Sequence, residues 1–402
     1  MGKKIMKVVF QVFGVFLFIS ISSYALLAAY GYQIDVLKQN IVKTSIIDLS
    51  NPLDEVKVYF NDTLVAEKTP FQIKNIEPGE HTVKISKQGF LPWQKKVKVE
   101  LNVVSKINDI LLLPEKFEIY GKNFDLGFDY DSVINNNQWI LFISYKNNKI
   151  HAYKLNENGS FLIDSLNIKL NKNYNFSFAG DDNLVYQDKN MLTMLNLSDK
   201  SIMNVAVPDE FENFRLAFSP SLKGFYINGG NLYSADIDDD GAFKEIILLS
   251  EDKVFKTEGF EIENFINRNL ILTDSSLYLY DGSAVKLLDK DVSGNPEFYS
   301  NGNELLFIKN WHEIIRYNIV DSSEYFIGRL GQKVDQVAWF ADNNHLLIKT
   351  GKELSVCDFT FTNCRQILNI TDDDMIIPGL KETQFVMISK NQIVSYTYKV
   401  PN

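Results

Sequence analysis

The chain has 402 residues, enough for two or three domains, and its 45% hydrophobic and 23% charged residues are typical of a folded protein. Its net charge of −10 is concentrated in residues 115–402, which carry 27 basic against 41 acidic side chains. An acidic domain of this kind would repel a phosphate backbone, so nucleic acid is excluded as an expected partner.

The N-terminus predicts a membrane anchor. Lys3, Lys4 and Lys7 precede an uncharged stretch from Val8 to Ile34, and about 20 helical residues are enough to cross a bilayer. The positive-inside rule places the basic end in the cytoplasm. We therefore predict a cytoplasmic tip and transmembrane helix over residues 1–34. The protein would be a single-pass protein of the cell membrane, with its bulk extracytoplasmic.

A cleaved signal peptide is the alternative. The small residues Ala25, Ala28 and Ala29 offer a cleavage site. The apolar region of a signal peptide is usually only about 7–15 residues long, however, which favours an uncleaved signal anchor. In both cases the folded part of the chain is exported.

A linker and a small β module are expected next. Residues 35–53 are predicted as a linker that ends at the turn Asn51-Pro52. Residues 54–114 contain short alternating apolar segments separated by turns, as in His81-Thr-Val-Lys-Ile85, which is typical of β-strands.

The order of features in this module resembles the PEGA domain. The resemblance rests on the spacing from Thr69-Pro70 through Glu77-Pro78-Gly79-Glu80 to Gly89-Phe90 and Trp93. It implies a small β-sandwich-like module of exported, envelope-associated proteins. It also implies a spacer or binding role near the membrane surface, and it brings no catalytic residues.

Seven short apolar triplets recur along the rest of the chain. Their first residues are 35 to 45 positions apart, and these residues are Trp139, Leu184, Phe225, Leu270, Leu305, Leu346 and Phe385. A period near 40 residues with four strands per unit is typical of a β-propeller blade. The repeats loosely resemble TolB-like and WD40-like propellers. The sequence therefore predicts an all-β protein with one transmembrane helix, a PEGA-like module and a seven-bladed β-propeller over residues 115–402.

Closure of the propeller is predicted from its two ends. The last unit stops at Asn402 without a fourth strand, and an additional apolar stretch, EKFEIYG at 115–121, precedes the first blade. Placing residues 115–121 in the last blade would close the ring and cover an exposed strand edge.

One acidic loop is a candidate calcium site. Asp236, Asp238 and Asp240, followed by Gly241, fit the first half of an oxygen-rich calcium loop. The twelfth position is Ile247 instead of a bidentate Glu, so a plain hairpin turn is the alternative. No other cofactor is expected.

The two cysteines are candidates for a disulfide. Cys357 and Cys364 would face each other across a hairpin, where opposed Cβ atoms lie about 4.5–5.5 Å apart. Export permits oxidation. Two reduced strand residues are the alternative.

The sequence offers little for catalysis. The four histidines lie in different units, and no hydrolase or zinc-protease motif is present. The four tryptophans could stack on sugars, although packing is their expected role. We therefore expect binding or scaffolding of an envelope protein or glycan. A propeller-based hydrolase or lyase acting on envelope polysaccharide and a purely structural stalk are the alternatives.

Overall fold

The structure is a computed structural model. It describes residues 2–29, 32–35, 40–43, 45–101, 103–119, 123–136, 138–155, 162–172, 174, 176–188, 190–208, 212–218, 222–228, 230–238, 243–250, 260–265, 268–273, 275–298, 303–340, 344–361, 363–378, 384–390 and 392–397. The chain forms two compact units, Met1–Glu115 with Lys399–Asn402, and Lys116–Tyr398.

The first unit begins with a long apolar helix. Helix α1 (Gly2–Ala29) contains the span Phe10–Leu27, which has a mean hydropathy of 1.9 and is not buried against the rest of the protein. Its 28 residues correspond to about 42 Å at 1.5 Å per residue, more than the ~30 Å of a bilayer core. The helix is thus long and apolar enough to span a membrane. A short hairpin follows, formed by β1 (Tyr32–Asp35) and β2 (Asn40–Lys43).

The predicted linker is shorter than the sequence suggested. Strand β3 (Ser45–Leu53) lies in the middle of a sheet, antiparallel to β6 (Thr69–Ile76) and parallel to β9 (Val104–Ile107). Its side chains alternate, so that Ile47 and Leu49 are completely buried. Residues 45–53 therefore belong to the β module, and the prediction of a linker over this part of 35–53 was wrong.

The module consists of two sheets around one core. One sheet has the order β6-β3-β9 and the other the order β5-β4-β7-β8. Val58, Val83 and Ile85 are fully buried in the core. The remaining strands are β4 (Lys57–Phe60), β5 (Thr63–Ala66), β7 (Gly79–Ser86) and β8 (Trp93–Val99).

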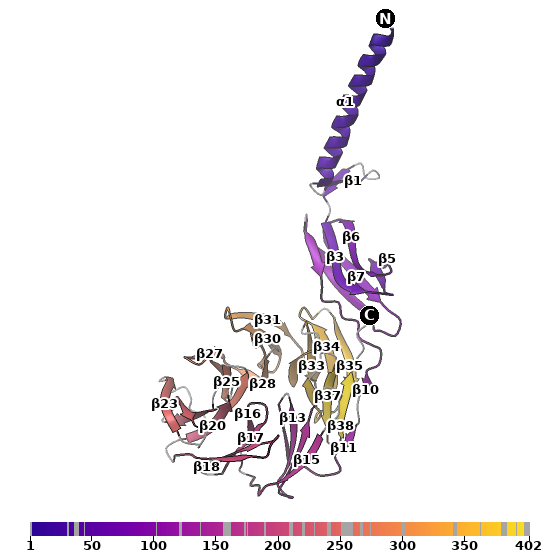
Figure 1. Cartoon of the computed structure of the whole chain (residues 1–402). Helices are drawn as coiled ribbons and strands as arrows, with labels where there is room; N and C mark the ends of the chain where they lie inside the picture. Colours follow the sequence, from indigo (N-terminus) through magenta and orange to yellow (C-terminus); the bar gives the residue numbers. More distant parts are fainter. Residues whose placement is uncertain are drawn as a thin grey trace. The chain divides into compact units, whose positions relative to one another are not determined.

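The second unit is a seven-bladed propeller of antiparallel sheets, which follow one another around the domain in Figure 1. Blades 1 to 3 comprise β12 (Ser132–Asn135), β13 (Trp139–Ser144), β14 (Lys149–Lys154) and β15 (Leu162–Asn167); β16 (Phe176–Ala179), β17 (Asn183–Asp188), β18 (Met191–Asn196) and β19 (Ile202–Ala206); and β20 (Glu212–Phe218), β21 (Leu222–Asn228), β22 (Asn231–Ile237) and β23 (Phe243–Ser250).

The remaining blades repeat this meander. Blades 4 to 6 comprise β24 (Phe260–Phe265), β25 (Arg268–Thr273), β26 (Ser276–Tyr280) and β27 (Val285–Asp289); β28 (Val292–Phe298), β29 (Glu304–Lys309), β30 (Glu313–Asn318) and β31 (Ser323–Arg329); and β32 (Gln336–Trp339), β33 (His345–Thr350), β34 (Glu353–Asp358) and β35 (Cys364–Asn369). Blade 7 contains β36 (Met375–Pro378), β37 (Gln384–Ser389) and β38 (Gln392–Thr397).

The apolar triplets of the sequence lie in the second strand of each blade. All six residues of β13 and of β33 are buried. A strand that is covered on both faces by neighbouring sheets has no polar side, so its sequence is continuously apolar instead of alternating. The second strands thus lie inside their sheets, between the first and third strands.

Two short strands at the start of the domain complete blade 7. Strand β10 (Glu118–Ile119) pairs antiparallel with β38, with Ile119 opposite Tyr396, and β11 (Phe124–Asp125) pairs with the same strand. Phe117 also makes an edge contact with Phe385, with the ring centroids 5.7 Å apart. Of the predicted closing stretch 115–121, residues 118 and 119 thus pair in blade 7, whereas the Glu115 N–H donates to the Gly89 carbonyl oxygen of the first unit at 3.1 Å. Residues 120 and 121 lie outside the described residues.

The contact between blades 5 and 6 yields a test of this packing. Gly328 in β31 lies against Phe361, and a Cβ atom added to Gly328 would be 2.8 Å from Cδ2 of that ring. We expect Gly328→Ala to lower the free energy of unfolding by about 1–3 kcal/mol, the usual cost of overpacking. Urea unfolding of the full chain in detergent would measure it.

Gly331→Ala is the matched control. A Cβ at Gly331 would have no neighbour within 4 Å, so this substitution should leave the stability within about 0.5 kcal/mol of the wild type. Equal stability of the two variants would contradict the contact.

Candidate functional site

The meander gives every blade two ends. At one end lie the turns between second and third strands, as between β13 and β14, together with the connections from one blade to the next, as between β15 and β16. We call this end the connection face. The turns between first and second strands and between third and fourth strands lie at the other end, the hairpin face.

An exposed tryptophan lies on the connection face in blade 5. Trp311 is 43% exposed in the turn between β29 and β30, whereas Trp93, Trp139 and Trp339 are buried. The packing role expected for the tryptophans therefore fits three of them, and Trp311 differs. Packing of this side chain into the core does not explain its presence.

The backbone at Trp311 is unusual for so large a residue. Asn310 and Trp311 have φ angles of 51° and 63°, and the His312 N–H donates to the Lys309 carbonyl oxygen at 3.1 Å. The hydrogen bond closes a turn whose two central residues both have positive φ, as in type I′, in which glycine is preferred after asparagine. A non-glycine residue in this conformation costs on the order of 1–3 kcal/mol, and such strain clusters at functional sites.

The surrounding backbone fixes the position of Trp311. Its N–H donates to Ser293 Oγ at 3.1 Å, and its carbonyl oxygen accepts a hydrogen bond from the Val334 N–H at 2.7 Å. The ammonium group of Lys333 lies 4.1 Å from the centre of the indole. Lys333 in turn pairs with Asp335 at 3.1 Å. Segments from blade 5 and from the connection to blade 6 thus hold an exposed aromatic ring in place.

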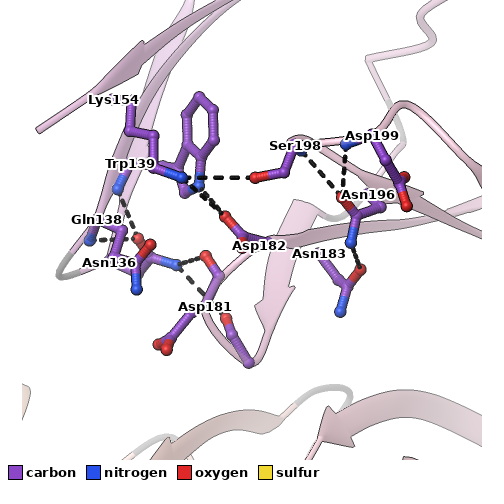
Figure 2. A network of polar contacts seen from close by, with 11 residues as sticks. Asn136, Gln138, Trp139, Lys154, Asp181, Asp182, Asn183, Asn196, Ser198 and Asp199 are labelled. Carbon is purple, nitrogen blue, oxygen red and sulfur yellow. Dashed lines mark hydrogen bonds and ion pairs between the residues drawn. The ribbon is translucent and has the colours of Figure 1, made fainter.

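A polar network joins blades 1 and 2 at the hairpin face (Figure 2). Trp139 Nε1 donates to Asp182 Oδ1 at 2.7 Å, and Lys154 Nζ lies 3.6 Å from the same carboxylate oxygen. The Lys154 ammonium group also lies 5.0 Å from the centre of the Trp139 ring. Asn136 Nδ2 donates to the Asp181 carbonyl oxygen at 2.8 Å. These contacts cross between blades and assign Trp139 a structural role.

The ionisation of Asp182 responds to this network. Burial alone would raise its pKa, but hydrogen bonds from Trp139 and Ser198 and the charge of Lys154 together hold the pKa below the ordinary value of 3.8. The charged form is therefore preferred in the folded state. Its stabilising contribution is present above pH 3.8 and is lost as the pH falls through the lower folded pKa.

This assignment predicts a pH-dependent effect of Asp182→Asn. At neutral pH the variant should unfold at lower urea concentration than the wild type, because Lys154 loses its carboxylate partner. The difference should shrink as the pH is lowered through the folded pKa. Urea titrations from neutral pH to below 3.8 would measure it.

Asp181→Asn is the control for this experiment. Asp181 is exposed and joins the network through its backbone carbonyl, so its substitution should follow the wild type throughout. A difference between Asp182→Asn and the wild type that stays constant with pH would contradict the role of the charge.

The two cysteines lie opposite each other in blade 6. Cys357 in β34 and Cys364 in β35 are register partners, and their sulfur atoms are bonded at 2.09 Å with the Cα atoms 4.1 Å apart. Between them, Asp358 accepts hydrogen bonds from Thr360 Oγ1 and Asn363 Nδ2, which shape the turn. The disulfide therefore closes a structured hairpin at the hairpin face.

Oxidation of this pair in the isolated protein can be measured by mass. Alkylation of the denatured protein should add no group without reductant and two groups after reduction. Cys364→Ser should take up one group without reductant, because Cys357 is then released. Two added groups on the unreduced wild type would contradict the disulfide.

The candidate calcium loop is only partly within the described residues. Asp236 forms an ion pair with Lys223 at 2.5 Å, so its carboxylate has a protein partner. Residues 239–242, including Asp240, lie outside the described residues. Calcium binding by Asp236, Asp238 and Asp240 stays a prediction. Among the residues that the structure describes, no three His, Cys, Asp or Glu side chains form a group that could hold a metal ion.

The histidines are not assembled into a catalytic group in the described part of the chain. His81 lies in the PEGA-like module, where its Nε2 is 2.7 Å from the Glu77 carbonyl oxygen. His151 stacks on Phe128 with the ring centroids 3.8 Å apart, and burial lowers its pKa. His345 is buried in β33 of blade 6. His312 lies beside Trp311, with Nδ1 3.1 Å from the Gln332 carbonyl oxygen.

One known family matches part of this chain. Residues 49–111 match the PEGA domain. A search of the curated proteins found no significant match to this chain. Similar solved structures are β-propellers.

Among them, virginiamycin B lyase from Staphylococcus aureus is 12% identical, with 71% of this chain and 100% of that chain covered and a TM-score of 0.47. YCF48 bound to D1 peptide is 13% identical, with 69% and 95% covered and a TM-score of 0.47. Hsv2 from Kluyveromyces lactis is 10% identical, with 67% and 91% covered and a TM-score of 0.45. The fold rests on the sheets of the chain itself, which form a β-propeller, and the PEGA match and one apolar helix precede it in the sequence. This combination fits an extracytoplasmic propeller protein.

Proposed function

We propose that this protein is a membrane-anchored binding protein of the cell envelope that recognises a glycan through the connection face of its propeller. Helix α1 would be the anchor, with the N-terminus in the cytoplasm and the folded domains outside. The observation that carries the proposal is the exposed Trp311, which is held in a turn where glycine would be less strained.

An indole in this position suits a sugar ring. Its flat apolar face carries partial negative charge, which complements the weakly positive C–H groups on one face of a pyranose. Because Lys333 lies over one face of the indole, the sugar would stack on the other face. Lys333 and Asp335 would also supply polar groups at the edge of the stacked ring.

Strain and exposure coincide at Trp311. Phe361 also has a positive φ of 54° but packs against Gly328, whereas the Trp311 ring is 43% exposed in a turn that glycine would serve with less strain. The side chain instead presents an aromatic surface to solvent at the cost of local strain. Backbone strain at an exposed side chain is typical of residues that bind a ligand.

Trp311→Gly is the variant that tests the proposal. Full-length protein in a neutral detergent would be screened on a glycan array, and the affinity for the best ligand would be measured by calorimetry. We expect the variant to lose at least about tenfold in affinity, equivalent to 1.4 kcal/mol. Its free energy of unfolding should stay within about 1 kcal/mol of the wild type, because the strain that it removes offsets the lost contacts.

Phe326→Ala is the matched control, since Phe326 is also an exposed aromatic residue but lies on the outer strand β31. Its affinity should equal that of the wild type. Retained binding by Trp311→Gly would overturn the role of Trp311. Turnover of the bound glycan would favour a hydrolase or lyase, and binding to envelope protein alone would favour a protein partner. Absence of any ligand would favour a structural stalk.

A further inference from the structure

A second feature of the connection face lies at blades 1 and 2. A pocket of about 850 Å³ is formed there by the turn between β13 and β14, the connection between β15 and β16, and the residue that precedes β12. It is separate in sequence and in blade from the turn that carries Trp311. Its charged lining residues are Lys146, Lys169, Lys172 and Asp131.

The charge of this pocket contrasts with that of its domain. Three lysines against one aspartate make it basic, whereas residues 115–402 have an excess of acidic side chains. Within the described part of the chain, none of the three lysine ammonium groups has an ion-pair partner. Some other lysines of the propeller do form ion pairs, as Lys309 does with Asp289 at 2.8 Å.

Asp131, which supplies the one carboxylate of the pocket lining, has a structural role. Asp131 Oδ2 accepts a hydrogen bond from the Tyr145 N–H at 2.8 Å, which fixes the start of the turn that carries Lys146. Three positive charges that line one pocket without an ion-pair partner repel one another, and this repulsion would be relieved when an anion binds among them. The arrangement thus favours an anionic ligand.

The walls of the pocket are fixed before any ligand binds. The Leu170 N–H donates to Asn148 Oδ1 at 2.9 Å, which ties the connection between the blades to the turn of blade 1. Tyr174 stacks on Tyr186 with the ring centroids 5.5 Å apart and the planes 22° from parallel. Tyr145 and Tyr174 therefore supply half-buried aromatic surface beside the lysines. Aromatic walls with a few charged groups are typical of ligand sites.

We propose that this pocket binds the anionic group of an acidic saccharide, either the carboxylate of a uronic acid or the phosphate of a polyol-phosphate chain. The saccharide rests on the proposed function, whereas the anion rests on the pocket alone. Lys146, Lys169 and Lys172 would neutralise the charge, and the tyrosine rings would contact the sugar or polyol. The pocket would then select acidic chains over neutral ones.

Three probes test this proposal with the full-length protein in neutral detergent. They are an oligogalacturonate for the carboxylate, a glycerol-phosphate oligomer for the phosphate, and a neutral chito-oligosaccharide. We expect at least one acidic probe to bind at least about tenfold more tightly than the neutral one. The preference should weaken with added salt, because exposed charges are screened over about 8–10 Å at physiological ionic strength.

The variant combines Lys146→Gln, Lys169→Gln and Lys172→Gln. It should lose the tenfold preference for acidic probes and keep its melting temperature. The matched control combines Lys290→Gln, Lys352→Gln and Lys390→Gln, three exposed lysines at connection-face positions of blades 4, 6 and 7. This control removes the same charge and should keep most of the preference.

The outcomes separate this proposal from that for Trp311. A preference for acidic probes that survives in the pocket variant, or an equal loss in both lysine triples, would overturn the pocket. Binding of neither acidic probe by the wild type would also overturn it. Trp311→Gly should weaken the binding of neutral and acidic saccharides alike. If this variant kept its affinity while the lysine variant lost its preference, only the role proposed for Trp311 would be overturned.

Discussion

The pairing of β10 with β38 is the constraint on which the propeller depends. It joins a strand from the beginning of the domain to the strand at its end, so that the last sheet gains an outer strand. Without it, β38 would present a free edge, and unpaired strand edges favour aggregation. The joint also has the largest sequence separation in the domain. Its loop-closure entropy must therefore be overcome by the burial of residues such as Phe385 and Ile393.

Because the ring is closed, the turns can take roles other than stabilising the fold. The second strands are buried on both faces and secure each blade, so the turns at their ends need not contribute to stability. The fold tolerates a strained turn at Trp311, because β29 and β30 pair in register over their whole length on either side of it. The hairpin face shows the opposite use of turns. There Trp139, Lys154 and Asp182 hold two blades together.

The sequence predicted the parts that depend on local pattern. Continuous apolar triplets marked the second strands, since strands covered on both faces lose polar alternation. Strand β3 was missed because Asn51-Pro52 indicates a turn, while the burial of Ile47 and Leu49 depends on partners more than 20 residues away. The features on which the proposed binding rests were beyond prediction for a different reason. The φ angle of Trp311 follows from the hairpin register, and the basic pocket combines residues that are far apart in the sequence.

The charge distribution would give the proposed binding of an acidic saccharide a physical basis for selectivity. An acidic domain repels anionic polymers over its general surface, which suppresses nonspecific adhesion of an acidic envelope chain. A basic pocket within that surface would offer attraction only at short range, beside the three lysines that line it. Repulsion elsewhere and attraction at one site together increase the difference in free energy between correct and incorrect placements of the same polymer. On the proposal that the pocket binds an acidic saccharide, the excess of acidic residues and the basic pocket would therefore act together in positioning that ligand.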